Sequence, residues 1–175
     1  MKQRISIKTD ILKFGLLQGI TTIIYSFSIY VRGNFAKINT SHATIFLLIL
    51  ACWIMIGMIK FKKTNDNYIS LGEALKIGIG ITVFGGFLAI LWKILLIHVI
   101  DPDIITQLEE KQINYMIKNS DDFTQENIDR RVALTRKYTS PLIQIGAAIL
   151  ESLFLGFIIS LVGGFIIRKK KIPIK

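Results

Sequence analysis

The sequence contains little of what a soluble enzyme or a disulfide-bonded domain requires. Its 175 residues include one cysteine, two histidines and three prolines. A lone cysteine, Cys52, excludes an internal disulfide framework, and so few sulfur and imidazole ligands argue against a metal site. Only 19% of the residues are charged. This is too little polar surface for a water-soluble globular fold.

Acidic residues are scarce as well. There are 12 aspartates and glutamates against 22 lysines and arginines, which gives a net charge of +10. Such a balance can indicate nucleic-acid binding, but here the bases flank apolar runs and do not cover a soluble face. We therefore expect anionic lipid headgroups as the counter-charge and no nucleic-acid partner.

Long apolar runs make up most of the chain. Hydrophobic residues account for 51% of it, and the mean hydropathy is +0.51. A hydrocarbon core roughly 30 Å thick takes about 20 helical residues. Four runs reach this length, and they lack the strict alternation of barrel strands. The sequence predicts an all-α integral membrane protein, one domain over residues 1–175, with transmembrane helices over residues 11–31, 43–59, 74–100 and 142–167.

The basic residues predict the orientation of these helices. They form three clusters, namely Lys2, Arg4, Lys8 and Lys13; Lys60, Lys62, Lys63 and Lys76; and Arg168, Lys169, Lys170, Lys171 and Lys175. With four crossings, all three clusters lie on one side of the membrane. The positive-inside rule makes that side cytoplasmic. We therefore expect a multi-pass protein of the inner, or plasma, membrane with both termini in the cytoplasm.

One longer polar segment, residues 101–140, separates the third and fourth runs. Asp101 and Pro102 have the form of a helix N-cap and its first residue, and a polar break over residues 119–122 divides two apolar helical stripes. These features predict a non-cytoplasmic helical hairpin between the third and fourth transmembrane helices. Its stripes are expected to pack on each other and on the headgroup region, with a partner-binding groove as the alternative.

Two charged residues interrupt the predicted transmembrane helices. Lys93 lies in the third helix and Glu151 in the fourth. Charge inside a bilayer is costly, and antiparallel neighbouring helices would bring these two side chains to similar depths. We expect an intramembrane ion pair, with snorkelling of Lys93 toward the headgroups and a proton-relay or substrate-binding role as the alternatives.

Small residues recur every four positions along the same two helices. They are Ser152, Gly156, Ser160 and Gly164 in the fourth helix, and Gly78, Thr82 and Gly86 in the third. Such ridges allow helix backbones to approach closely in lipid. Packing inside the bundle is the favoured interpretation, and a seam between two copies of the chain is the alternative.

No catalytic or cofactor motif accompanies these features. His42 and His98 lack a second ligand at metal-binding spacing, and the glycines fall inside apolar helices and not in phosphate-binding loops. The leading hypothesis is a non-enzymatic protein with a structural or interaction role, partnered by itself or another membrane protein and holding no cofactor or metal. A small transporter or channel component using Lys93 and Glu151 is the alternative, and a membrane enzyme ranks third.

The order of features along the chain also resembles a known family. Residues 69–78 read ISLGEALKIG, the charged segment follows, and Pro141, Leu142 and Glu151 mark the last helix. This arrangement is similar to the domain of unknown function 4199 family, small membrane proteins found mainly in Bacteroidetes. The resemblance implies four helices in the inner membrane and supplies no catalytic residues.

Overall fold

The computed structural model consists of four long helices. It describes residues 7–33, 40–104, 106–107, 110, 114, 126–127, 129–130, 134 and 141–168. The helices are α1 (Ile7–Val31), α2 (Thr40–Thr64), α3 (Leu71–Leu95) and α6 (Pro141–Ile167), and a π-helical turn, η2 (Leu96–Ile100), extends α3. All four are long and apolar enough to cross a membrane. For the described residues, the prediction of an all-helical fold with four helices long and apolar enough to span a membrane is confirmed.

The helices extend beyond the apolar runs from which they were predicted. α2 continues past residues 43–59 at both ends, and α1 begins about one turn before residue 11. Hydropathy marks only the residues that lie in hydrocarbon, whereas backbone hydrogen bonding continues through the polar interface. The ends of α6, at Pro141 and Ile167, lie within one residue of the predicted segment.

A capping box begins α3. The Glu73 amide donates to Ser70 Oγ at 3.3 Å, and the Ser70 amide donates to Glu73 Oε2 at 2.8 Å. Each side chain therefore satisfies a backbone group that the first helical turn leaves without a partner. The preceding turn has positive φ at Asp66 and Asn67, two residue types that tolerate this conformation. Together these features reverse the chain sharply between α2 and α3.

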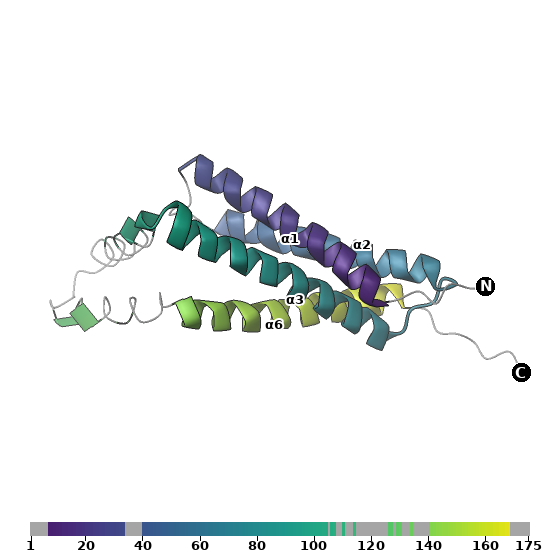
Figure 1. Cartoon of the computed structure of the whole chain (residues 1–175). Coiled ribbons are helices and arrows are strands. Elements are labelled where there is room, and N and C mark those ends of the chain that lie inside the picture. The colour runs from purple at the N-terminus through teal and green to yellow at the C-terminus, as the bar shows by residue number, and fades with distance from the viewer. Residues whose placement is uncertain are drawn as a thin grey trace, which may run out of the picture.

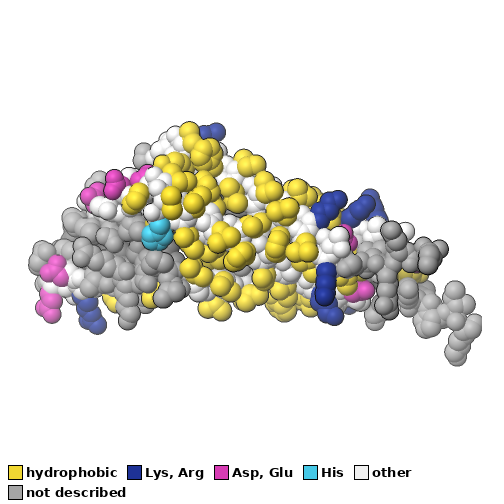
Figure 2. All heavy atoms as spheres, in the orientation of Figure 1, with side chains coloured by type: hydrophobic (Ala, Val, Ile, Leu, Met, Phe, Trp, Pro, Cys, Tyr) yellow, Lys and Arg dark blue, Asp and Glu magenta, His cyan; other side chains and the backbone are white. Residues whose placement is uncertain are grey.

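Figure 1 shows that the start of α1, the turn between α2 and α3 and the end of α6 lie at one end of an elongated bundle. We call this the basic end. Lysine and arginine side chains gather there, beside a band of apolar side chains that covers the middle of the visible face (Figure 2). Aspartate and glutamate side chains lie mainly beyond the other end of the band. This layering matches a bilayer-crossing bundle with polar ends.

α3 is the central helix and contacts the other three. It runs parallel to α1, where the Gly15 and Gly19 backbones approach Phe84 and Leu88. Toward the basic end, α2 and α3 supply most of the main apolar core, which contains Phe14, Leu50, Ile54, Met58, Phe61, Ile69, Ala74, Ile77 and Ile81. A second cluster, Leu96, Ile97 and Ile104, lies at the opposite end. The bundle is therefore packed most tightly near its basic end.

The two predicted ridges of small residues face each other between α3 and α6. A methyl group on Gly156 would lie 2.6 Å from Thr82 Oγ1, and one on Gly78 would lie 1.7 Å from Ser160 Oγ. Gly164 meets Ala74 and Leu71, and Gly86 meets Ser152. The ridges are thus used inside the bundle, which is the arrangement that close packing in lipid favours.

The helical hairpin predicted over residues 101–140 lies largely outside the described residues. Ile104 is described, and it packs in the second apolar cluster with Leu96 and Ile97. This contact does not show the hairpin, which stays a prediction.

The α3–α6 contact yields a test with a control on the same helix. Gly156→Ala is expected to destabilise the protein by about 1–3 kcal/mol, because the added methyl group overlaps Thr82. A methyl group on Gly146 meets nothing within 4 Å, so Gly146→Ala should be neutral or slightly stabilising. Thermal unfolding in detergent, followed by circular dichroism, measures both. Equal midpoints for the two variants would contradict the packing described here.

Candidate functional site

The four helices surround a partly open cavity of about 410 Å³, a size that suits a small ligand. It lies in the middle of the bundle and in the half away from the basic end. Every helix contributes to its wall. The lining residues are Gln18, Thr22, Ala43, Phe46, Leu47, Leu50, Thr82, Gly86, Ala89, Ile90, Lys93, Ala148, Glu151, Ser152 and Leu155.

Packing near the basic end explains why the space lies where it does. There α2 and α6 meet closely, since a methyl group on Gly163 would lie 2.6 Å from Met55 Sδ. At the same end, Lys62 Nζ donates to the carbonyl of Ile167 at 2.8 Å and ties α2 to the end of α6. Farther along, Leu50 of α2 and Leu155 of α6 both line the cavity. The bundle is thus closed at one end and hollow toward the other.

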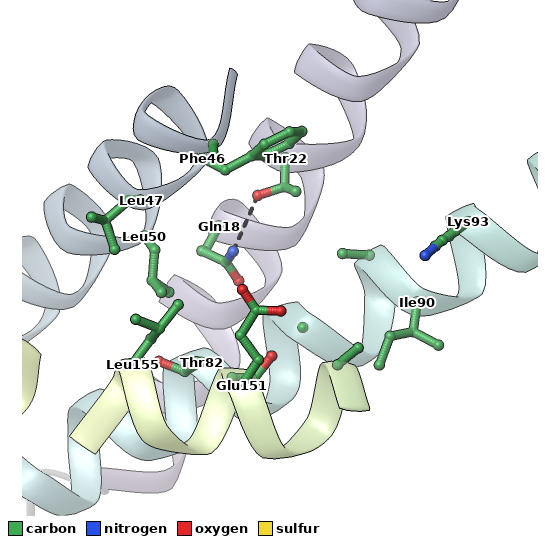
Figure 3. A pocket seen from close by; sticks show the side chains of 15 residues that line it. Gln18, Thr22, Phe46, Leu47, Leu50, Thr82, Ile90, Lys93, Glu151 and Leu155 are labelled. Carbon is green, nitrogen blue, oxygen red and sulfur yellow. Dashed lines mark hydrogen bonds between the residues drawn. The ribbon is translucent and has the colours of Figure 1, made fainter. Parts of the chain in front are cut away.

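Glu151 and Lys93 both face this cavity, from α6 and α3 respectively. Figure 3 shows the Glu151 carboxyl group pointing away from α6 toward α1, while the Lys93 ammonium group points inward from farther along α3. Both side chains are exposed. In the part of the chain that the structure describes, no salt bridge within 4.0 Å joins them. The cavity brings the two charges together without a direct contact, and their pairing stays a prediction.

Gln18 of α1 brings a third polar group to the cavity. Its side chain is only 6% exposed, and its Nε2 donates to Thr22 Oγ1 at 3.1 Å. Its Oε1 is buried and receives no hydrogen bond. The amide fits against α3 because residue 85 is glycine, since a methyl group there would lie 1.5 Å from Oε1. The Glu151 carboxyl group points toward this amide in Figure 3.

Sequence reasoning missed Gln18 and Thr22 because it weighed only charged residues inside the membrane. A signal was present, since a glutamine four residues before a threonine puts two polar side chains on one face of an apolar helix. Uncharged amides in lipid also need partners. What the sequence cannot show is that this face of α1 turns toward Glu151.

The predicted ridge residues fall into two groups around the cavity. Thr82, Gly86 and Ser152 form part of its wall, whereas Gly78, Gly156, Ser160 and Gly164 do not line it. Thr82 Oγ1 donates to the carbonyl of Gly78 at 2.9 Å, and Ser160 Oγ donates to the carbonyl of Gly156. These hydroxyl groups are satisfied within their own helices, which lets the two helices pack closely without unpaired donors.

The cavity can bind but holds no recognisable catalytic constellation. Among the described residues, no three histidine, cysteine, aspartate or glutamate side chains lie close enough to hold a metal ion. His42 is hydrogen-bonded through Nδ1 to the Tyr25 hydroxyl group at 2.8 Å, where α2 meets α1. Among the described residues that line the cavity, the charged ones are one acid and one base, Glu151 and Lys93. This arrangement suits the recognition of a polar or charged molecule.

The shared cavity predicts how substitutions of the two charges combine. Glu151→Gln and Lys93→Met should have non-additive effects on stability, with a coupling of about 0.5–3 kcal/mol, because one cavity contains both side chains. Unfolding of both single variants and the double variant in detergent measures this coupling. Additive losses of stability would show that the two charges do not interact.

Comparison with known proteins agrees with the resemblance in the sequence. No curated protein and no solved structure matches the chain. The model of one family, described as "Protein of unknown function (DUF4199)", matches residues 13–169, which covers all four helices except the first turns of α1. The chain therefore belongs to the DUF4199 family.

Proposed function

We propose that this chain is a non-enzymatic inner-membrane protein that binds a small polar solute within the bilayer, as a small transporter or a component of one. The observation that carries this proposal is the convergence of Glu151, Lys93 and Gln18 on one cavity. Polar groups in transmembrane helices commonly mark the path of a solute or ion. A cavity between helices is where such a solute would bind.

The packing of the small residues supports this function over a purely structural one. A role in self-association rested on the ridges of α3 and α6, and those ridges meet each other within one copy of the chain. A structural role for the charges would be served best by direct contact, which relieves the cost of placing them in lipid. Lys93 and Glu151 instead share a space large enough for a ligand.

The orientation that we propose has the basic end in the cytoplasm. The positive-inside rule supports it, because the lysine-rich and arginine-rich segments border all four helix ends on that side. Anionic headgroups of the cytoplasmic leaflet would then be the lipid partners. The cavity would open toward the non-cytoplasmic half of the bilayer, on the side of the hairpin predicted over residues 101–140.

Thiol labelling tests whether the cavity holds water. In a Cys52→Ala background, Ala148→Cys lines the cavity and Leu150→Cys, where the native side chain is 70% exposed on the apolar surface, faces lipid at nearly the same depth. A water-soluble, membrane-impermeant methanethiosulfonate should label Ala148→Cys at least about tenfold faster, because only a hydrated thiol ionises readily to the reactive thiolate. Mass spectrometry of intact protein measures the rates.

The same comparison can contradict the proposal. Equal and slow labelling at both positions would mean that the cavity is dry and closed. This result would contradict the proposed solute-binding role. Ala89→Cys, on the α3 side of the cavity, provides a second lining position. It should be labelled like Ala148→Cys.

Reporter fusions test the orientation. Green fluorescent protein fused after Lys175 should fluoresce, because it folds in the cytoplasm, and alkaline phosphatase inserted within residues 101–140 should be active, because it requires the opposite side. A phosphatase inserted in the turn at Asn67 is the matched control and should be inactive. Activity at Asn67 would reverse the proposed topology.

A further inference from the structure

We infer that the cavity binds a zwitterion, a small molecule or headgroup that carries an ammonium group and an anionic group a few bonds apart. The ammonium group would bind at Glu151 and the anionic group at Lys93. This inference rests on the proposed solute-binding function and specifies its ligand. The juxtaposition that carries it is one acid and one base on two neighbouring helices, facing the same space without a direct salt bridge.

The charges of the cavity discriminate among ligand classes. A simple anion attracted by Lys93 would be repelled by Glu151. A simple cation attracted by Glu151 would be repelled by Lys93. An uncharged solute would leave both charges without a counter-ion in a wall that is otherwise mostly apolar, including Phe46, Leu50 and Leu155. A zwitterion neutralises both groups at once. The occupied cavity would then contain two satisfied ion pairs and no net charge.

Glu151 marks the acceptor end of the cavity. Its side chain lines the cavity, and the donors of an ammonium group can serve the two oxygens of an ionised carboxyl group. Gln18 Oε1 is covered against Gly85, so the ammonium group is assigned to Glu151 alone. Lys93, which has donors only, then marks the end that receives the anionic group.

Two sources could supply this chemistry, and they differ in their surroundings. One is a soluble amino acid-like molecule, and the other is the phosphoethanolamine headgroup of a lipid. An apolar groove of about 280 Å³ lies along α3 and α6 and shares Gly86, Ile90 and Ser152 with the cavity wall. A lipid whose headgroup binds in the cavity could place an acyl chain in this groove. If a soluble zwitterion binds instead, acyl chains of the surrounding bilayer would cover the groove.

Protection of the Ala148→Cys thiol tests the inference in the full-length protein in nanodiscs. The soluble probes are glycine, γ-aminobutyrate and ε-aminocaproate, which carry the same two charges at increasing separation. Butylamine and butyrate each carry one charge and are the controls. The zwitterion that best matches the gap should slow labelling about tenfold at about ten times its Kd, whereas neither control should. Glu151→Gln and Lys93→Met should each weaken this protection about tenfold or more.

A second arm distinguishes the lipid source. Nanodiscs of phosphatidylglycerol alone are compared with nanodiscs that also contain phosphatidylethanolamine, without any soluble probe. Slower labelling only in the presence of phosphatidylethanolamine, reversed by Glu151→Gln, supports a lipid headgroup. Protection by a soluble probe in phosphatidylglycerol supports a free zwitterion.

Other outcomes overturn the inference. Rapid labelling that no zwitterion slows would show that the charges recognise something else. This result is expected if the Gln18 amide is rotated so that its Nε2 donates to Glu151. Equal protection by butylamine or butyrate would indicate a singly charged ligand. If Ala148→Cys is never labelled, the proposed solute-binding function fails as well, so the two failures are distinguishable.

Discussion

The close approach of α3 to its neighbours is the contact on which the rest of the structure depends. Within lipid, apolar side chains gain nothing by leaving one oily surface for another, so helices associate through van der Waals packing and a few hydrogen bonds. Glycines allow this contact on both sides of α3. Gly15 and Gly19 bring α1 against it, and Gly156 brings α6 against it. α3 is therefore fixed between two helices that make no comparable contact with each other.

The cavity follows from this packing. Small residues hold α6 against α3, and α2 meets α6 closely near the basic end, where Met55 lies against Gly163. Beyond that point, the space between the helices is lined by groups that a purely apolar bundle would not retain. Glu151, Lys93 and Gln18 are each costly to place in lipid. Their convergence on one cavity is the physical basis of the proposal that a solute binds there.

Local features of the structure could be predicted from the sequence because they depend on residues that are close together in the chain. The capping box of Ser70 and Glu73 depends only on a serine that stands three residues before a glutamate, and it is present with both of its hydrogen bonds. The helix boundaries were predicted less accurately. α2 extends beyond its apolar run because polar residues such as Lys62 and Thr64 continue the helix outside hydrocarbon. The spacing of the small residues could also be predicted from the sequence. The sequence did not show which helix surfaces these ridges would contact.

The sequence by itself determined that the described part of the chain contains four helices long and apolar enough to span a membrane, since this depends only on the length and hydropathy of each segment and on the hydrogen-bonding demands of a backbone in lipid. It also carried the family assignment. Only the tertiary structure decided that Gln18 lies on the same cavity as Glu151 and that Lys93 faces Glu151 without touching it. These relations depend on the rotation of each helix about its axis. That rotation is set by side-chain packing between segments far apart in the chain, which the periodicity of a single helix does not encode.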